Sequence, residues 1–118
     1  MTSLKLNWIK CQGDVWCSFQ NLNIDHEFFD HFNGVYIIWE DQKVIKIAGG
    51  NIRTCIKEDR NSPDLVVHYP KAKVTYAKVS ESDRQGVISF LSNQFKVTQP
   101  STIPASEQIE VNFPWWQA

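Results

Sequence analysis

The hydrophobic pattern along the chain predicts a small sheet and two amphipathic helices. Residues 35–39 are consecutive apolar residues, typical of a strand buried on both faces, and residues 43–48 form the expected return strand of a hairpin. Residues 73–79 alternate and are rich in β-formers, which predicts a third central strand. Apolar residues three and four positions apart predict helices over 52–60 and 81–95. This order favours an α+β fold with a small, mostly antiparallel sheet flanked by helices.

Both ends of the chain predict extended structure around this core. Residues 4–19 surround the turn-forming pair Gly13-Asp14, which predicts an N-terminal β-hairpin. The tail, residues 97–118, is interrupted by prolines, and we expect it to pack back as an extended segment. Between hairpin and core, the spacing over residues 23–32 predicts a short helix or helical turn. Its expected apolar face consists of Ile24, Phe28, Phe29 and Phe32.

Polar residues mark the expected helix ends. Asn51 is the expected N-cap of the helix over 52–60. Ser80 and Asp83 have the spacing of a capping box. Asn23 or Asp25 would cap the short helix, while the pattern over 64–69 is ambiguous.

The chain of 118 residues fits one domain, residues 1–118, with a core of about 33–96. An apolar fraction of 42% is enough for a folded core. We expect most of the five tryptophans to pack in that core. No apolar run approaches the length that crosses a membrane, so no membrane partner is expected.

The cysteines predict a reduced, cytoplasmic protein. Their number is odd, and the chain opens without a signal-like apolar run. On one strand, Cys11 and Cys17 would share a face but lie too far apart to bridge. The third, Cys55, belongs to the helix predicted over 52–60.

The charges are distributed unevenly. The net charge of −1 argues against a strong nucleic-acid binder. Residues 43–78, however, hold eight basic and three acidic residues, a charge of +5, whereas the remainder carries −6. Such a block is equally consistent with a solvated face. His26 and His31 are five apart and His68 is remote, so the histidines predict no metal site.

The chain contains two short motifs. One lies just before the basic block of residues 43–78, and the other lies within it. Gly34-Val35-Tyr36 begins the first core strand, and Lys46 to Arg53, with Gly49-Gly50 inside it, leads from the return strand into a helix. The pair resembles the signature of GIY-YIG nuclease domains over residues 33–96, and more loosely in the tail at 112–115. The resemblance implies an α+β fold of this kind and metal-assisted hydrolysis of phosphodiesters.

In active members of that family, two tyrosines lie beside the attacking water. An arginine on the first helix stabilises the phosphate charge, and a glutamate on the second helix holds a divalent metal. Here the first tyrosine is kept as Tyr36, while the second falls on Lys46. The arginine falls on Cys55, the glutamate on Ile88, and a histidine often seen one turn after the arginine on Asp59.

These substitutions imply a degenerate, catalytically impaired domain in which Tyr36 is vestigial. Isoleucine removes the hard oxygen ligand that magnesium prefers, and cysteine removes the guanidinium fork for phosphate. The nearest acids, Glu81 and Asp83, lie at the helix start, more than a turn away. No cofactor is expected. Magnesium or manganese would act only in a weak endonuclease with relocated ligands.

Three functions therefore remain. The first is a non-catalytic domain with weak, salt-sensitive affinity for nucleic acid. Its expected phosphate-binding residues are Lys46, Arg53, Lys57, Lys73 and Lys78. The second is a protein-interaction module that uses aromatic surface such as Trp115 and Trp116. The third is a weak metal-dependent endonuclease. At the mouth of a former phosphate site, Lys46 either binds an anion or extends to the rim.

Overall fold

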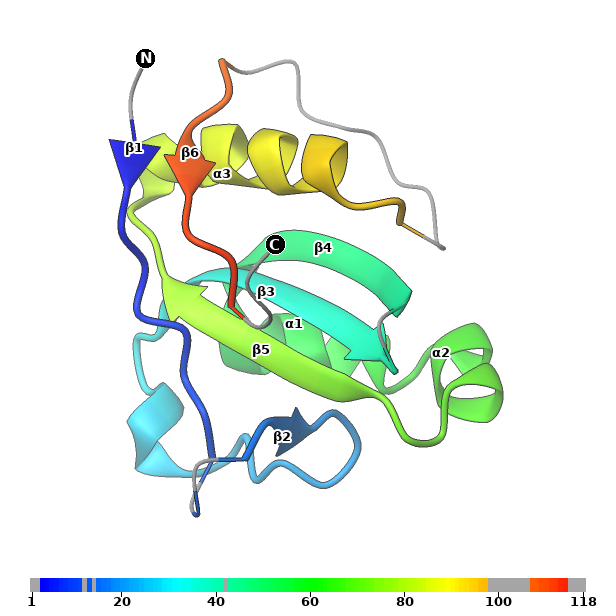
Figure 1. Ribbon diagram of the computed structural model, residues 1–118. Coiled ribbons are helices and arrows are strands. Elements are labelled where there is room, and N and C mark those ends of the chain that lie inside the picture. The colour runs from blue at the N-terminus through cyan, green and yellow to red at the C-terminus, as the bar shows by residue number, and fades with distance from the viewer. Residues whose placement is uncertain (1–2, 12, 14, 42, 98–106, 115–118) are drawn as a thin grey trace.

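The sheet has four antiparallel strands in the order β2-β5-β3-β4, as the computed structural model shows (Figure 1). The strands are β2 (Cys17–Ser18), β3 (Asn33–Glu40), β4 (Lys43–Asn51) and β5 (Lys73–Lys78). The structure describes residues 3–11, 13, 15–41, 43–97 and 107–114. The predicted α+β class, with an antiparallel sheet flanked by helices, is confirmed.

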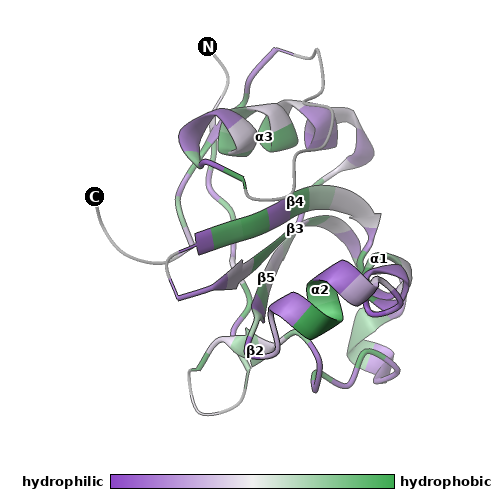
Figure 2. Ribbon diagram, turned by 90° about the vertical axis from the view of Figure 1, so that its right-hand side faces the viewer, coloured by the Kyte–Doolittle hydropathy of each residue, from purple (hydrophilic) through white to green (hydrophobic). Residues whose placement is uncertain are grey.

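Helices cover both faces of the sheet. They are α1 (Ile52–Asp59), α2 (Pro63–His68) and α3 (Glu81–Gln94). Figure 2 shows α3 on one side of the sheet and α1 and α2 on the other. The alternation of β3 follows this division, because Tyr36 and Ile38 pack with α1 whereas Val35 and Ile37 pack with α3. We call these two sides the α1 face and the α3 face.

The predicted core elements match the structure apart from their ends. The strands predicted over 35–39, 43–48 and 73–79 correspond to β3, β4 and β5, and the predicted helices to α1 and α3. The ambiguous segment 64–69 forms most of α2. Strong periodicity and buried apolar runs therefore identified the central elements.

Glycine and asparagine shape the motif region. A Cβ atom at Gly34 would lie 1.9 Å from the carbonyl oxygen of Ala77 on β5, so only glycine allows the two strands to pair this closely. Gly50 has a φ of 141°, where the chain turns from β4 towards α1. Asn51 then caps α1 as predicted, since its side-chain oxygen accepts the N–H of Thr54 at 3.0 Å.

The predicted capping box of α3 does not form its bonds. Ser80 is the N-cap, but its side chain accepts no backbone N–H. Its hydroxyl instead donates to the carboxylate of Asp83 at 2.9 Å. The spacing located the helix start correctly, but the hydroxyl is used in a different bond.

The N-terminal segment reverses direction as the predicted hairpin requires. Cys11 and Val15 pair across Gly13, which has a positive φ of 82°. Beyond this bridge, the two arms pair with other strands. The first arm begins with β1 (Ser3–Leu4), which runs parallel to β6 (Glu110–Val111), and the second arm forms β2 against β5.

The prediction that Cys11 and Cys17 cannot bridge is wrong. The two residues form a disulfide, with their Cα atoms 5.2 Å apart. The prediction treated both as part of one strand, although the turn predicted at residues 13–14 lies between them. The reversal there brings the two arms together. Cys55 is the free cysteine.

The short helix predicted over residues 23–32 is only one 3₁₀ turn, η1 (Glu27–Phe29). Its N-cap is His26, whose imidazole accepts the N–H of Phe28, rather than Asn23 or Asp25. Because the segment is not an α-helix, its phenylalanines do not share one face. Phe29 and Phe32 are buried, while Phe28 is exposed.

The described part of the tail is extended, as predicted, and packs beside the first residues of the chain. The side chain of Asn112 accepts the N–H of Leu6 at 2.6 Å and donates to its carbonyl oxygen at 3.0 Å. The prediction for Trp115 and Trp116 lies outside the described residues. Among the helices described, none is long and apolar enough to span a membrane.

Candidate functional site: a closed polar centre and an open cleft

Three of the positions singled out by the motif meet on the α1 face. Tyr36 lies on β3, Lys46 on β4 and Asp59 at the end of α1. The first two both bond to the carboxylate of Asp59. The Tyr36 hydroxyl donates to Oδ2 of Asp59 at 2.6 Å, and Lys46 Nζ donates to Oδ1 at 2.5 Å. The Asp59 side chain is 7% exposed, and that of Lys46 is 28% exposed. We call this group the polar centre.

Burial and charge keep Tyr36 of the polar centre protonated. Burial raises the pKa of Tyr36 well above its usual value, and the carboxylate of Asp59 raises it further. The phenol therefore stays protonated and acts as a donor. Cys55 lies beside it, and burial followed by the charges of Asp59 and Glu58 raises the pKa of its thiol. The position expected to hold an arginine thus carries a neutral, weakly nucleophilic group.

Sequence reasoning missed the role of Asp59, although α1 contained the signal. Ile52, Ile56 and Asp59 follow one another at helical spacing on the side of α1 that packs against the sheet, and all three are buried. A carboxylate on an otherwise apolar stripe needs buried partners. The two strands that α1 covers supply a hydroxyl and an ammonium group.

Ile88 does not join the polar centre. It is buried on the α3 face, in the cluster that contains Val87 and Leu91. Tyr36 belongs to the cluster on the other face of the sheet. The position that the resemblance assigns to a metal ligand is therefore separated from Tyr36 by the sheet. Within the described ranges, no group of three or more His, Cys, Asp or Glu residues is arranged to hold a metal ion.

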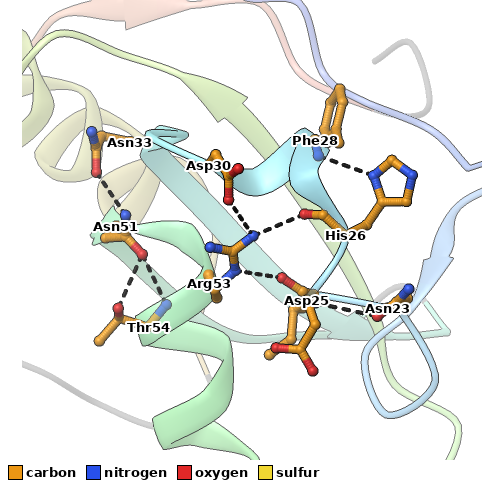
Figure 3. A network of polar contacts seen from close by, with 10 residues as sticks. Asn23, Asp25, His26, Phe28, Asp30, Asn33, Asn51, Arg53 and Thr54 are labelled. Carbon is orange, nitrogen blue, oxygen red and sulfur yellow. Dashed lines mark hydrogen bonds and ion pairs between the residues drawn. The ribbon is translucent and has the colours of Figure 1, made fainter.

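Arg53 binds the loop before β3 (Figure 3). Its Nε donates to the carbonyl oxygen of Ile24 at 2.6 Å, and one terminal nitrogen donates to that of His26 at 2.8 Å. The same nitrogen forms an ion pair with Asp30 at 2.9 Å. Arg60, one residue after α1, likewise donates to carbonyl oxygens of this N-terminal region. The two arginines therefore hold loops against α1.

The other predicted phosphate-binding residues lie apart. Lys57 is exposed on α1. Lys73 and Lys78 begin and end β5, and an odd spacing on a strand places them on opposite faces of the sheet. Among the described residues, none of these three lysines makes an ion pair. The five predicted residues therefore do not form a single surface.

Among the described residues, two surface clefts each contain one of the predicted phosphate-binding lysines. The first has a volume of about 390 Å³. Its walls are formed by Asn7, Ile9, Phe28, Phe32 and Lys78, and we call it the Phe28 cleft. The second, of about 450 Å³, is lined by Ser18, Asn21, Trp39, Asp41, Pro70, Lys71 and Lys73.

Comparison with known proteins adds no assignment. No protein-family model, curated protein or solved structure matches the chain. A functional assignment therefore depends on the motif, the fold, the polar centre and the surface clefts.

Proposed function

We propose that this chain is a catalytically inactive domain of GIY-YIG descent that binds nucleic acid weakly. The element order supports this descent, since a hairpin of β3 and β4 enters α1 through a glycine-containing turn and is followed by β5 and α3. This is the arrangement that the motif pair implies. The polar centre is the observation that supports the proposed loss of catalysis.

Metal-assisted hydrolysis needs a metal and a cation that both face the scissile phosphate. In the polar centre, the only ammonium group bonds directly to the only carboxylate. The Tyr36 hydroxyl is also directed at that carboxylate. The centre is therefore neutral and internally satisfied, with neither an open set of oxygen ligands nor a free cation for phosphate.

Lysines outside this centre support the binding role. Lys57, Lys73 and Lys78 keep their charge free of ion pairs with other described residues, whereas Lys46 and Arg53 are engaged internally. With a net charge of −1, we expect only non-specific affinity, on the order of micromolar or weaker at moderate salt.

A cleavage assay tests the catalytic half of the proposal. The purified chain is incubated with single- and double-stranded DNA and RNA, and with magnesium or manganese. We expect no cleavage. Metal-dependent cleavage that disappears in Tyr36→Phe would instead establish the endonuclease alternative with relocated ligands.

A titration at low salt tests the binding half. We expect association that weakens steeply as salt rises. If neither DNA nor RNA binds, a protein-interaction module of the same fold becomes the better proposal.

The predicted cytoplasmic location requires Cys11 and Cys17 to be reduced in the cell, because disulfides persist mainly in oxidising compartments, whereas the structure pairs the two residues. Counting free thiols after rapid alkylation in cells tests whether the cysteines are reduced. Three free thiols support the cytoplasmic proposal, and one contradicts it.

A further inference from the structure

The Phe28 cleft contains an aromatic ring that is exposed and yet held in place. Phe28 is 46% exposed, although the neighbouring Phe29 and Phe32 are buried. Its backbone N–H is fixed by the imidazole of His26 at 3.0 Å. Its ring lies 5.2 Å from that of Phe29, edge to face, and 5.4 Å from that of Phe32. The exposed face is therefore presented rigidly, as a stacking platform requires.

A cation lies at the same cleft. Lys78 Nζ is 5.4 Å from the centre of the Phe32 ring, a cation–π contact that orders the side chain without neutralising it. Lys78 forms no ion pair with any described residue. It can therefore bind an anion that arrives with a planar group.

The remaining features suit a single unstacked base. A volume of about 390 Å³ lies near the lower end of the range for small-molecule sites, about 300–1,000 Å³. The exposed Asn7 supplies an amide that both donates and accepts, which suits the edge of a base. Asp25 and Glu27, on the same loop as Phe28, are exposed acids and limit the affinity.

We propose that the Phe28 cleft binds one unpaired base of single-stranded nucleic acid, with the base stacked on Phe28 and the adjacent phosphate at Lys78. This inference rests on the proposed nucleic-acid binding and assigns it a site. A duplex fits less well, because its bases are already stacked on one another. Stacking on an aromatic side chain tolerates any base, so we expect little sequence preference.

The test is fluorescence anisotropy of labelled oligo-dT and oligo-rU, titrated with the full chain at low salt. Phe28→Leu keeps an apolar side chain but removes the ring, and we expect it to weaken binding about fivefold or more. Phe28→Trp keeps an aromatic face and should retain the affinity. Val67→Ala, at another exposed apolar position, is the matched control and should bind as the wild type does.

The charge is tested in the same way. Lys78→Gln should weaken binding and lower the slope of log K against log salt by about 0.7, the value for one phosphate contact on a single strand. Lys96→Gln removes the same charge from an exposed position outside the cleft and should change the affinity much less. Thermal melting of each variant verifies folding.

The outcomes separate the two proposals. If the wild type binds and the Phe28 and Lys78 variants match their controls, the cleft is not the site, although the domain still binds nucleic acid. If the wild type binds neither oligonucleotide, both proposals fail, and a protein partner becomes the better occupant of the cleft. Weakening confined to Phe28→Leu and Lys78→Gln establishes the cleft as the site.

Discussion

Two lysines on the α1 face of the sheet have opposite surroundings. Lys46 on β4 is hydrogen-bonded to the buried carboxylate of Asp59 at 2.5 Å. Lys78, at the end of β5, is exposed and lies over the Phe32 ring. The first lies within the motif of residues 46–53, and the second lies outside it.

The difference shows that one lysine is committed to a buried ion pair while the other keeps an accessible charge. A buried carboxylate requires a compensating charge, and a lysine that supplies it is no longer free for phosphate. A lysine over an aromatic ring is ordered but not neutralised. We therefore expect the polar centre to contribute stability and the Phe28 cleft to contribute affinity.

The largest effect is expected from breaking the polar centre. Lys46→Ala leaves the Asp59 carboxylate buried without a counter-ion, and we expect a loss of about 2–4 kcal/mol in the free energy of unfolding. Because the Lys46 side chain is 28% exposed, solvent screens the pair and keeps the loss below that of a fully buried one. Urea denaturation measures the loss, and Lys57→Ala, at an exposed position on α1, is the control.

The double variant Lys46→Met, Asp59→Leu sharpens this prediction. Removing both charges together should recover most of the loss, because neither partner is then left unpaired. If Lys46→Ala were no more destabilising than Lys57→Ala, the polar centre would be solvated rather than closed.

A somewhat smaller loss, about 2–3 kcal/mol, is expected for Ile88→Glu, because the substitution places an unpaired charge in the apolar cluster of the α3 face. Gln85→Glu introduces the same side chain at an exposed position on α3 and should have little effect. Thermal melting compares the two variants. An unchanged melting temperature in Ile88→Glu would mean that this position opens to solvent.

A smaller effect should appear at alkaline pH. Burial raises the pKa of Tyr76 to about 12 and that of Tyr36 further still, from an ordinary value near 10. The unfolded chain therefore releases these protons first, so their contribution to stability is complete below about pH 10 and declines as the pH rises above it. Tyr36→Phe should make the decline shallower in urea denaturation at pH 9, 10 and 11. A decline equally steep in wild type and variant would show that Tyr36 does not contribute.

The sequence predicted those parts of the molecule whose pattern is local. The buried run of β3 and the spacing of α1 and α3 identified the core, and Asn51 identified the start of α1. The cysteine prediction failed because it treated residues on two arms of a reversal as one strand.

The candidate functional surfaces depend on contacts between distant segments, which the sequence pattern could not supply. Asp59 meets Lys46 only after α1 folds back over β4, and Arg53 finds its partners 23–29 residues away along the chain. Phe28 was expected on an apolar helix face, and it is exposed because that helix is reduced to a 3₁₀ turn. The exposed ring of the Phe28 cleft could therefore not be foreseen.

The division between the two sites is tested most directly by NMR titration of the ¹⁵N-labelled chain with oligo-dT at low salt. The account predicts amide chemical-shift changes centred on Asn7, Ile9, Phe28 and Lys78, with little change at Tyr36, Lys46 and Asp59. Changes centred on the polar centre, with the Phe28 cleft unaffected, would contradict it.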